Sequence, residues 1–185
     1  MSLTEAKFLT DEEFKSLQDL LAKFKDPTKS SKTSYRDALL LRLAIKTSGR
    51  GVEVLRITPN DLGQGTVTVP GAKGSNSRTI PLPADFFREL KDYSEGMDPQ
   101  APIFPISTRH FRRIWSQYRP NPKKGSHSIR HTGALKLFLN CQNLKAVQQY
   151  LGQKEIKNTM VYLDYTEGAH KLRSRMKGMW TKKIA

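Results

Sequence analysis

The sequence predicts an α+β fold that is mainly α-helical and carries one small antiparallel β-sheet. Three observations support this prediction: apolar residues recur at helical spacing in several segments, two short β-rich runs stand close together, and turn residues separate the elements. With 185 residues, the chain is long enough for one domain with its own hydrophobic core. We therefore expect a single domain over residues 4–185 and treat residues 1–3 as a candidate expression remnant.

The helices are predicted from capping residues and apolar spacing. Thr10 and Glu13 form a capping-box pattern ahead of a first helix that should end near Asp26. A largely apolar run from Tyr35 predicts a buried helix that Gly49 is placed to stop. Further helices are expected over residues 83–93, from Ser107 or Thr108 to Tyr118, over residues 127–140, and from Asn143 to about residue 151.

Two β-rich runs, Thr66 to Val69 and Arg78 to Leu82, predict the sheet. The link between them, residues 70–77, holds glycines and an asparagine, which favour a turn. We therefore expect the two runs to pair as an antiparallel hairpin.

The charge of the chain predicts a polyanionic partner. Lys and Arg number 32 against 17 acidic residues, which gives a formal net charge of +15 and a pI near 10. Neutralising phosphates releases condensed counterions, so nucleic acid is the expected partner and a membrane surface the alternative. Against a membrane, no apolar run approaches about 18 residues, and the N-terminus lacks the apolar core of a signal peptide. A cytoplasmic location is the default expectation.

Cysteine usage argues against disulfides and structural zinc. Cys141 is the single cysteine, which excludes an internal disulfide, and no Cys/His cluster has the spacing of a zinc site. The chain also shows no phosphate-binding glycine loop of the kind found in nucleotide hydrolases. We therefore expect no cofactor and no metal.

A series of polar side chains occurs in an informative order: an arginine at a helix end with an acid three residues later, a lysine in the hairpin, a His-x-x-Arg pair and a late tyrosine. These residues are Arg50, Glu53, Lys73, His127, Arg130 and Tyr162. The order resembles the tyrosine recombinase family of DNA breaking-rejoining enzymes, also called the phage-integrase type. The motifs are TSGRGVEVL (47–55), GAKG (71–74), RTIPL (78–82), HSIRHT (127–132), LGQ (151–153) and TMVY (159–162), so the resemblance covers nearly all of the chain.

The two arginines suit a phosphate clamp. Breaking a phosphodiester without a metal requires fixed cations to meet the extra negative charge of the transition state, and guanidinium stays protonated while offering paired donors. The resemblance places Arg50 and Arg130 there, although each alone could cap a helix end or pair with a surface acid. Glu53 lies one helical turn from Arg50 and could orient it, with a solvated surface glutamate as the alternative.

His127 lies three residues before Arg130, so both side chains should share one helical face and reach one phosphate. The resemblance implies that its imidazole moves a proton or donates to a phosphate oxygen. His131 is expected to point elsewhere, as a packing or hydrogen-bonding residue. For Lys73, the resemblance implies the mobile lysine that protonates the departing 5′ oxygen. A turn lysine facing solvent or a non-scissile phosphate is the alternative.

Tyr162 is the expected nucleophile. A phenol with a pKa of about 10 needs neighbouring cations or a base before it attacks phosphorus. Tyr162 stands nine residues after Gln153 and thirty-two after Arg130, which matches the family's spacing, and Tyr165 is the competitor. Gln153 departs from the family, which usually has His or Trp there. Its amide can still donate a hydrogen bond to a phosphate oxygen, but the departure leaves a non-catalytic DNA-binding homologue as an alternative.

The resemblance implies the catalytic domain of a site-specific recombinase or integrase. Such an enzyme cleaves and rejoins double-stranded DNA through a 3′-phosphotyrosyl intermediate without metal or ATP. A type IB topoisomerase shares this chemistry and is a further alternative, disfavoured by the Leu-Gly step before the tyrosine and by the short hairpin.

The resemblance also implies an assembly. Recombining members carry an N-terminal core-binding DNA domain, which we expect to be absent from this chain. The resemblance implies a homo-oligomer on DNA, in a tetrameric synapse. In isolation, a monomer of this chain is the alternative. The segment from Ala169 to Trp180 has helical apolar spacing and resembles the C-terminal helix that members dock onto a neighbouring protomer; packing on its own domain is the alternative. We expect a prokaryotic, phage or mobile-element origin.

Overall fold

The computed structural model describes residues 3–72 and 74–166, and every structural statement below concerns these residues. Lys73, the expected general acid, lies outside them. So does the C-terminal segment from Ala169 to Trp180, for which a docking helix is expected from the sequence.

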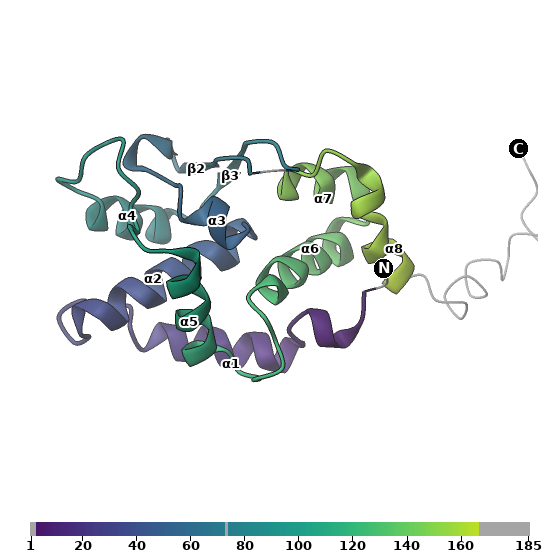
Figure 1. The fold of residues 1–185 in the computed structure, drawn as a ribbon, viewed down its shortest axis with the longest axis horizontal. Helices are drawn as coiled ribbons and strands as arrows, with labels where there is room; N and C mark the ends of the chain where they lie inside the picture. The colour runs from purple at the N-terminus through teal and green to yellow at the C-terminus, as the bar shows by residue number, and fades with distance from the viewer. Residues whose placement is uncertain (1–2, 73, 167–185) are drawn as a thin grey trace, which may run out of the picture.

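Helices make up most of the fold, and the sheet lies along one edge (Figure 1). The long α2 lies beside α1, and α6 connects this region to α7 and α8 at the other end of the molecule. The α-helices are α1 Asp11–Ala22, α2 Lys32–Thr47, α3 Gly51–Val54, α4 Ala84–Tyr93, α5 Thr108–Tyr118, α6 His127–Cys141, α7 Leu144–Leu151 and α8 Met160–Thr166. Three 3-10 helices are η1 Glu5–Lys7, η2 Pro59–Asp61 and η3 Ile156–Asn158. The mainly helical α+β prediction is confirmed.

The sheet has the strand order β1-β2-β3, with both pairs antiparallel. Its strands are β1 Leu62–Gly63, β2 Thr66–Val69 and β3 Arg78–Pro81. The hairpin of β2 and β3 is confirmed, whereas β1 was not expected, because two residues show no alternating pattern. On β3, Arg78 and Ile80 alternate with exposed residues and lie on the buried face. The strand therefore points a cation into the protein.

Two hydrophobic clusters hold the elements together. The larger cluster is formed by α1, α2, α3, the sheet, α4 and α5, and the first turn of α6 adds Ile129. The smaller cluster joins Leu3 and Phe8 of the N-terminal segment to α6, α7 and α8, and it includes Tyr162. Because α6 contributes to both clusters, its two ends are fixed by different sets of contacts.

The end of α2 differs from expectation. The residue in the left-handed conformation is Ser48, with φ 46°, and not Gly49. Contacts with distant residues hold Ser48 there, since its carbonyl accepts a hydrogen bond from Arg130 and its hydroxyl bonds the Tyr150 hydroxyl. Gly49 is required for space instead, because a Cβ at this position would lie 2.7 Å from Val54 Cγ2.

The first helix is capped as expected, because the Thr10 and Glu13 side chains each bond the other's backbone N–H. The helix ends at Ala22, however, and not near Asp26. The N–H groups of Lys23 and Phe24 bond carbonyls three residues back, which tightens the last turn and ends the helix early.

Gly133 on α6 allows this helix to pack closely against the end of α2. A methyl group at this position would overlap Ser48 Oγ. We expect Gly133→Ala to lower the free energy of unfolding in urea by about 1–3 kcal/mol, the usual range for overpacking. Adding Ser48→Gly removes the opposing atoms, so the double variant should lose less than the sum of the two single changes. Gly125→Ala, which meets open space, is the control, and an equal loss there would contradict the clash.

Candidate active site

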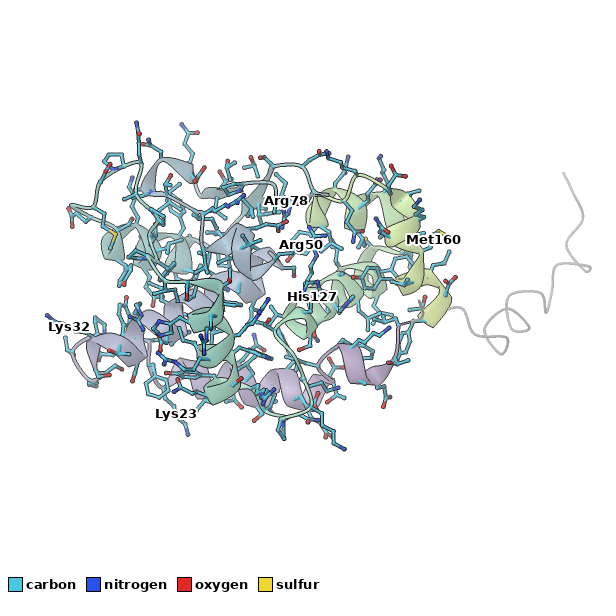
Figure 2. The ribbon with its side chains drawn as sticks, in the orientation of Figure 1. Lys23, Lys32, Arg50, Arg78, His127 and Met160 are labelled. Atoms are coloured by element: carbon cyan, nitrogen blue, oxygen red, sulfur yellow. The ribbon has the colours of Figure 1, made fainter. Side chains whose placement is uncertain are left out.

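The site is organised around the buried carboxylate of Glu53, which has no exposed surface. Arg50 Nη1 and Ser75 Oγ donate to its Oε1 at 2.9 and 2.6 Å. Arg78 Nη2 donates to Oε2 at 2.9 Å, and Arg130 Nη1 lies 3.5 Å from the same oxygen. Three guanidinium groups, from the N-cap of α3, from β3 and from α6, therefore meet at one carboxylate. Figure 2 shows Arg50, Arg78 and His127 close together where these elements meet.

The local sequence explains how Arg50 and Glu53 pair. Arg50 is the N-cap residue of α3 and has an extended backbone, while Glu53 stands at the third helical position. From there its carboxylate reaches back to the Arg50 backbone N–H at 2.9 Å, which satisfies a donor that the helix leaves open. The expected pairing of Glu53 with Arg50 is confirmed, and the alternative of a solvated glutamate is wrong.

The charge of Glu53 is strongly stabilised. Burial alone would raise the pKa of this carboxyl group, but hydrogen bonds from Ser75 and from the Arg50 backbone, together with the charge of Arg78, lower the pKa to about 2. Glu53 is therefore ionised at neutral pH. One negative charge then holds three positive ones, which leaves an excess of positive charge at this place.

Arg130 is fixed in the interior of the protein. Its Nη1 donates to the Ser48 carbonyl at 3.0 Å and its Nη2 to the Leu151 carbonyl at 2.8 Å. Burial, and then the charge of Arg50, lower the pKa of Arg130 to about 10, so the guanidinium is still protonated at neutral pH. Arg50 differs, since 27% of its side chain is exposed against 4% for Arg130. Arg50 is thus the more accessible cation of the two.

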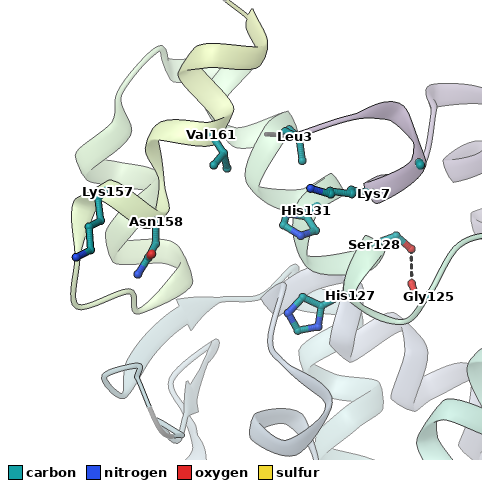
Figure 3. A pocket seen from close by; sticks show the side chains of 10 residues that line it. Leu3, Lys7, Gly125, His127, Ser128, His131, Lys157, Asn158 and Val161 are labelled. Carbon is teal, nitrogen blue, oxygen red and sulfur yellow. Dashed lines mark hydrogen bonds between the residues drawn. The ribbon is translucent and has the colours of Figure 1, made fainter. Parts of the chain in front are cut away.

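The two histidines of α6 lie beside each other. His127 is exposed to solvent, but neighbouring protein atoms displace part of the water around its ring. This desolvation, followed by the charges of Arg130 and Arg50, lowers the pKa of the imidazole. Its ring centroid lies 5.9 Å from that of His131, one turn further along the helix. Both rings line a cavity of about 490 Å³, whose opposite wall includes Val161 (Figure 3). Val161 directly precedes Tyr162 on α8, so the cavity adjoins the helix that carries the tyrosine.

Tyr162 lies in the smaller hydrophobic cluster with 1% of its surface exposed. Its hydroxyl is 3.1 Å from His131 Nδ1. Burial raises the pKa of the phenol to about 12, although the charges of Arg130 and Arg50 act in the opposite direction. The prediction that His131 forms hydrogen bonds is confirmed, but the expectation that it points away from the site is wrong, because packing of α8 on α6 brings the phenol to it.

Gln153 follows Gly152, whose φ of 65° ends α7. The side-chain oxygen of Gln153 accepts a hydrogen bond from Thr159 Oγ1 at 2.7 Å, which leaves its amide nitrogen to donate elsewhere. Its backbone bridges Ser75 in the β2–β3 link, and the Asn76 N–H bonds the Gly152 carbonyl at 2.8 Å. The link that carries Lys73 is thereby tied to the end of α7 on the side that follows the lysine.

The structure therefore brings Arg50, Glu53 and Arg130 into contact and places His127 beside them. Two contributors were missed by sequence reasoning. The alternation of β3 places Arg78 on the buried face and could have indicated it, whereas no sequence signal indicates Ser75. The competitor Tyr165 is partly exposed and packs edge-on against Phe8, with ring centroids 5.2 Å apart.

The family model described as the phage integrase family matches residues 7–168. The chain belongs to the phage integrase family. It is 26% identical over 177 residues to tyrosine recombinase XerA of Pyrococcus furiosus, covering 88% of this chain and 59% of the relative. It is 29% identical over 165 residues to tyrosine recombinase XerD of Staphylococcus saprophyticus, covering 79% of this chain and 56% of the relative. The chain thus spans less than two thirds of the length of these relatives.

Solved structures confirm the fold. The XerH site-specific recombinase bound to its difH substrate in a pre-cleavage complex superposes with a TM-score of 0.73 at 21% identity, covering 99% of this chain and 56% of that one. The catalytic domain of bacteriophage HP1 integrase gives a TM-score of 0.62 at 21% identity, covering 92% of this chain and 94% of that domain. The predicted tyrosine recombinase catalytic fold is therefore confirmed.

None of the described helices combines the length and the apolar character needed to cross a bilayer.

Protonation of Glu53 should destabilise the protein in acid. Its pKa is lowered from 4.5 to about 2 on folding, so its contribution is fully present above pH 4.5 and is lost as the pH falls towards 2. The difference corresponds to about 3 kcal/mol. We expect Glu53→Gln to lower the free energy of unfolding at pH 7 by about 3–5 kcal/mol, because the buried guanidinium groups lose their counter-charge. Urea unfolding at several pH values measures both effects.

The acid-dependent loss between pH 4.5 and 2 should be smaller in Glu53→Gln than in the parent chain. The matched control is Glu12→Gln on the exposed side of α1, which should change stability at pH 7 by no more than about 0.5 kcal/mol. Equal stability of Glu53→Gln and Glu12→Gln at pH 7 would contradict the central role of Glu53.

Proposed function

We propose that this chain is the catalytic domain of a tyrosine-type site-specific recombinase, which cleaves and rejoins double-stranded DNA through a covalent link between Tyr162 and a 3′-phosphate. The observation that carries the proposal is that Arg50 and Arg130 both pair with Glu53. The charges of both arginines also act to lower the pKa of the Tyr162 phenol, against the effect of burial. Membership of the phage integrase family supports it, as do the recombinase names of the relatives.

In the proposed reaction, the Tyr162 oxygen attacks a DNA phosphorus and the bond from phosphorus to the 5′ oxygen breaks. The departing oxygen takes the electron pair of that bond and needs a proton, for which the family resemblance proposes Lys73. The phosphotyrosyl bond conserves the energy of the phosphodiester, so a 5′-hydroxyl from the same or another strand can reverse the step without ATP.

Arg50 and Arg130 are suited to meet the charge that develops on the phosphate. A guanidinium has five N–H donors, and carbonyl groups accept two of those of Arg130, so further donors are left for phosphate oxygens. Rigid donors that need no rearrangement stabilise a transition state most effectively. Glu53 is the proposed orienting residue, because it holds both guanidinium groups in place before DNA arrives.

His127 and Gln153 are proposed to complete the phosphate site. His127 is exposed beside both arginines, so its imidazole can donate to a phosphate oxygen or accept the proton of the phenol. Thr159 holds the oxygen of Gln153, which turns the amide nitrogen into the available donor. A donor at this position replaces the hydrogen bond, though not the charge, that the usual family histidine supplies.

Tyr162 cannot react from the position it occupies. With 1% of its surface exposed and a pKa raised to about 12, the phenol is protonated and out of reach of a DNA phosphorus. We propose that DNA binding displaces the tyrosine towards the arginines, where positive charge lowers its pKa. The cavity between His127 and Val161 provides space for this movement.

The proposed partner is double-stranded DNA, since the chain carries a net charge of +15. A homo-oligomer on DNA, tetrameric by family resemblance, is proposed with it. A lambda integrase structure with the same fold is a dimer bound to a core site, at a TM-score of 0.60 and 19% identity. A DNA substrate also supports the cytoplasmic location proposed for the protein. The recombinase and integrase names favour this function over the type IB topoisomerase alternative.

A nicked suicide duplex, which traps the covalent intermediate, tests the proposal. The parent chain should form a protein–DNA adduct that denaturing electrophoresis detects, and Tyr162→Phe should form none because it lacks the attacking oxygen. Tyr165→Phe is the matched control and should keep the adduct. If the parent forms no adduct yet binds the duplex, the chain is the non-catalytic DNA-binding module that Gln153 and the buried Tyr162 would also suit.

Arg130 should matter for cleavage far more than for DNA binding. Arg130→Lys keeps a positive charge but loses the planar set of donors, so single-turnover cleavage should fall by at least about 100-fold. Arg130→Ala should abolish it. Bulk duplex binding rests on many phosphate contacts and should change only a few-fold in a filter-binding assay. Unaltered cleavage in either variant would contradict the clamp.

A further inference from the structure

His131 is the residue that holds the Tyr162 hydroxyl, and the family resemblance assigned it no part in the reaction. Its Nδ1 lies 3.1 Å from the phenol oxygen, and the two ring centroids are 6.0 Å apart. Within the described part of the chain, the phenol oxygen has no other hydrogen-bond partner. Among the contacts that the described residues make, this one therefore sets the direction in which the hydroxyl points.

Both groups are neutral near pH 7. Burial lowers the pKa of the His131 imidazole to about 4, and electrostatic repulsion from His127, Arg130 and Lys7 acts in the same direction. The pKa of the Tyr162 phenol is raised to about 12. A base of pKa 4 does not remove a proton from an acid of pKa 12, so His131 is not the general base in this arrangement.

The direction of the hydrogen bond follows from what each group needs. A neutral imidazole has one N–H donor and one nitrogen that accepts. If Nδ1 carried the hydrogen, the phenol's own hydrogen would be buried without an acceptor among residues 3–72 and 74–166, which is costly. If Nδ1 accepts, the phenol is satisfied, and the Nε2–H belongs to a ring that lines the cavity beside His127, where water can accept it (Figure 3). The second arrangement satisfies every donor.

We propose that His131 is a positioning residue for the nucleophile: its Nδ1 accepts the Tyr162 O–H and holds the phenol in a buried, protonated resting position until the chain engages DNA. The proposal rests on the proposed function of Tyr162. The proposal assigns different roles to the two histidines of α6, because they have different neighbours. His127 lies beside the arginines that are proposed to bind the phosphate, whereas His131, one turn further along α6, contacts the Tyr162 hydroxyl.

The state of His131 can be measured in the unsubstituted chain without DNA. With ¹⁵N-labelled histidine at pH 7, two-bond correlations in an NMR spectrum distinguish a ring nitrogen that carries hydrogen from one that does not. The proposal requires a bare Nδ1 and a protonated Nε2 for His131. A hydrogen on Nδ1 would overturn it, because the imidazole would then donate to the phenol.

Two substitutions then separate positioning from packing. His131→Leu fills the space but offers no acceptor, so the phenol should leave its buried place and its pKa should fall from about 12 towards 10, a change of about 100-fold in the ionisation constant. His131→Asn places an amide oxygen near the position of Nδ1 and should keep the pKa high. Absorbance at 295 nm between pH 9 and 11 reports phenolate, and the difference from the same chain with Tyr162→Phe isolates Tyr162.

Tyr162 titrating in His131→Leu as it does in the parent would overturn the proposal, and so would an equal fall in His131→Leu and His131→Asn, which would show a packing role only. His110→Leu on α5 is the matched histidine control, since His110 contacts Arg113 and not Tyr162. Should His131→Leu not fold, the spectrum of the unsubstituted chain still decides. None of these measurements needs DNA. A chain that does not cleave DNA could still show the His131–Tyr162 hydrogen bond, and a chain that cleaves DNA could lack it, so the two proposals fail separately.

Discussion

One buried carboxylate makes the rest of this structure possible. Three guanidinium groups would repel one another if they met alone, and Glu53 supplies the opposite charge at the point where they meet. Removing either sign from such a buried group leaves uncompensated charge, so the members depend on one another. Arg50 caps α3, while Arg78 and Arg130 belong to β3 and α6, so the same ion cluster also fixes how these three elements sit together.

What could be predicted from the sequence is what is local. The pairing of Arg50 with Glu53 needs only one turn of helix, and His127 lies near Arg130 for the same reason. The capping box of α1 and the β2–β3 hairpin are short-range too. These features depend on residues a few positions apart, whose geometry is set by backbone periodicity before any tertiary packing occurs.

What could not be predicted depends on distant contacts. Ser48 adopts a left-handed conformation because Arg130 and Tyr150 hold it, and neither is near it in sequence. The contact between His131 and Tyr162 exists because α8 packs on α6, which no periodicity of either helix specifies. The burial of Tyr162 likewise follows from a cluster that reaches back to Leu3. The order of motifs indicated that Arg50, Glu53 and Arg130 would meet, whereas it indicated neither the contacts of Ser75 and Arg78 with Glu53 nor the burial of Tyr162.

The division of the core into two clusters means that the burial of Tyr162 and the positions of Arg50 and Arg78 depend on different packing contacts. The arginine-bearing α3 and β3 pack in the larger cluster, whereas the phenol belongs to the smaller one, together with the short N-terminal stretch around Phe8. Loosening the smaller cluster would therefore release the proposed nucleophile while Arg50 and Arg78, of the proposed phosphate site, keep their positions. Changes in a few apolar side chains would then shift the threshold of the proposed strand cleavage without altering the residues proposed to bind the substrate.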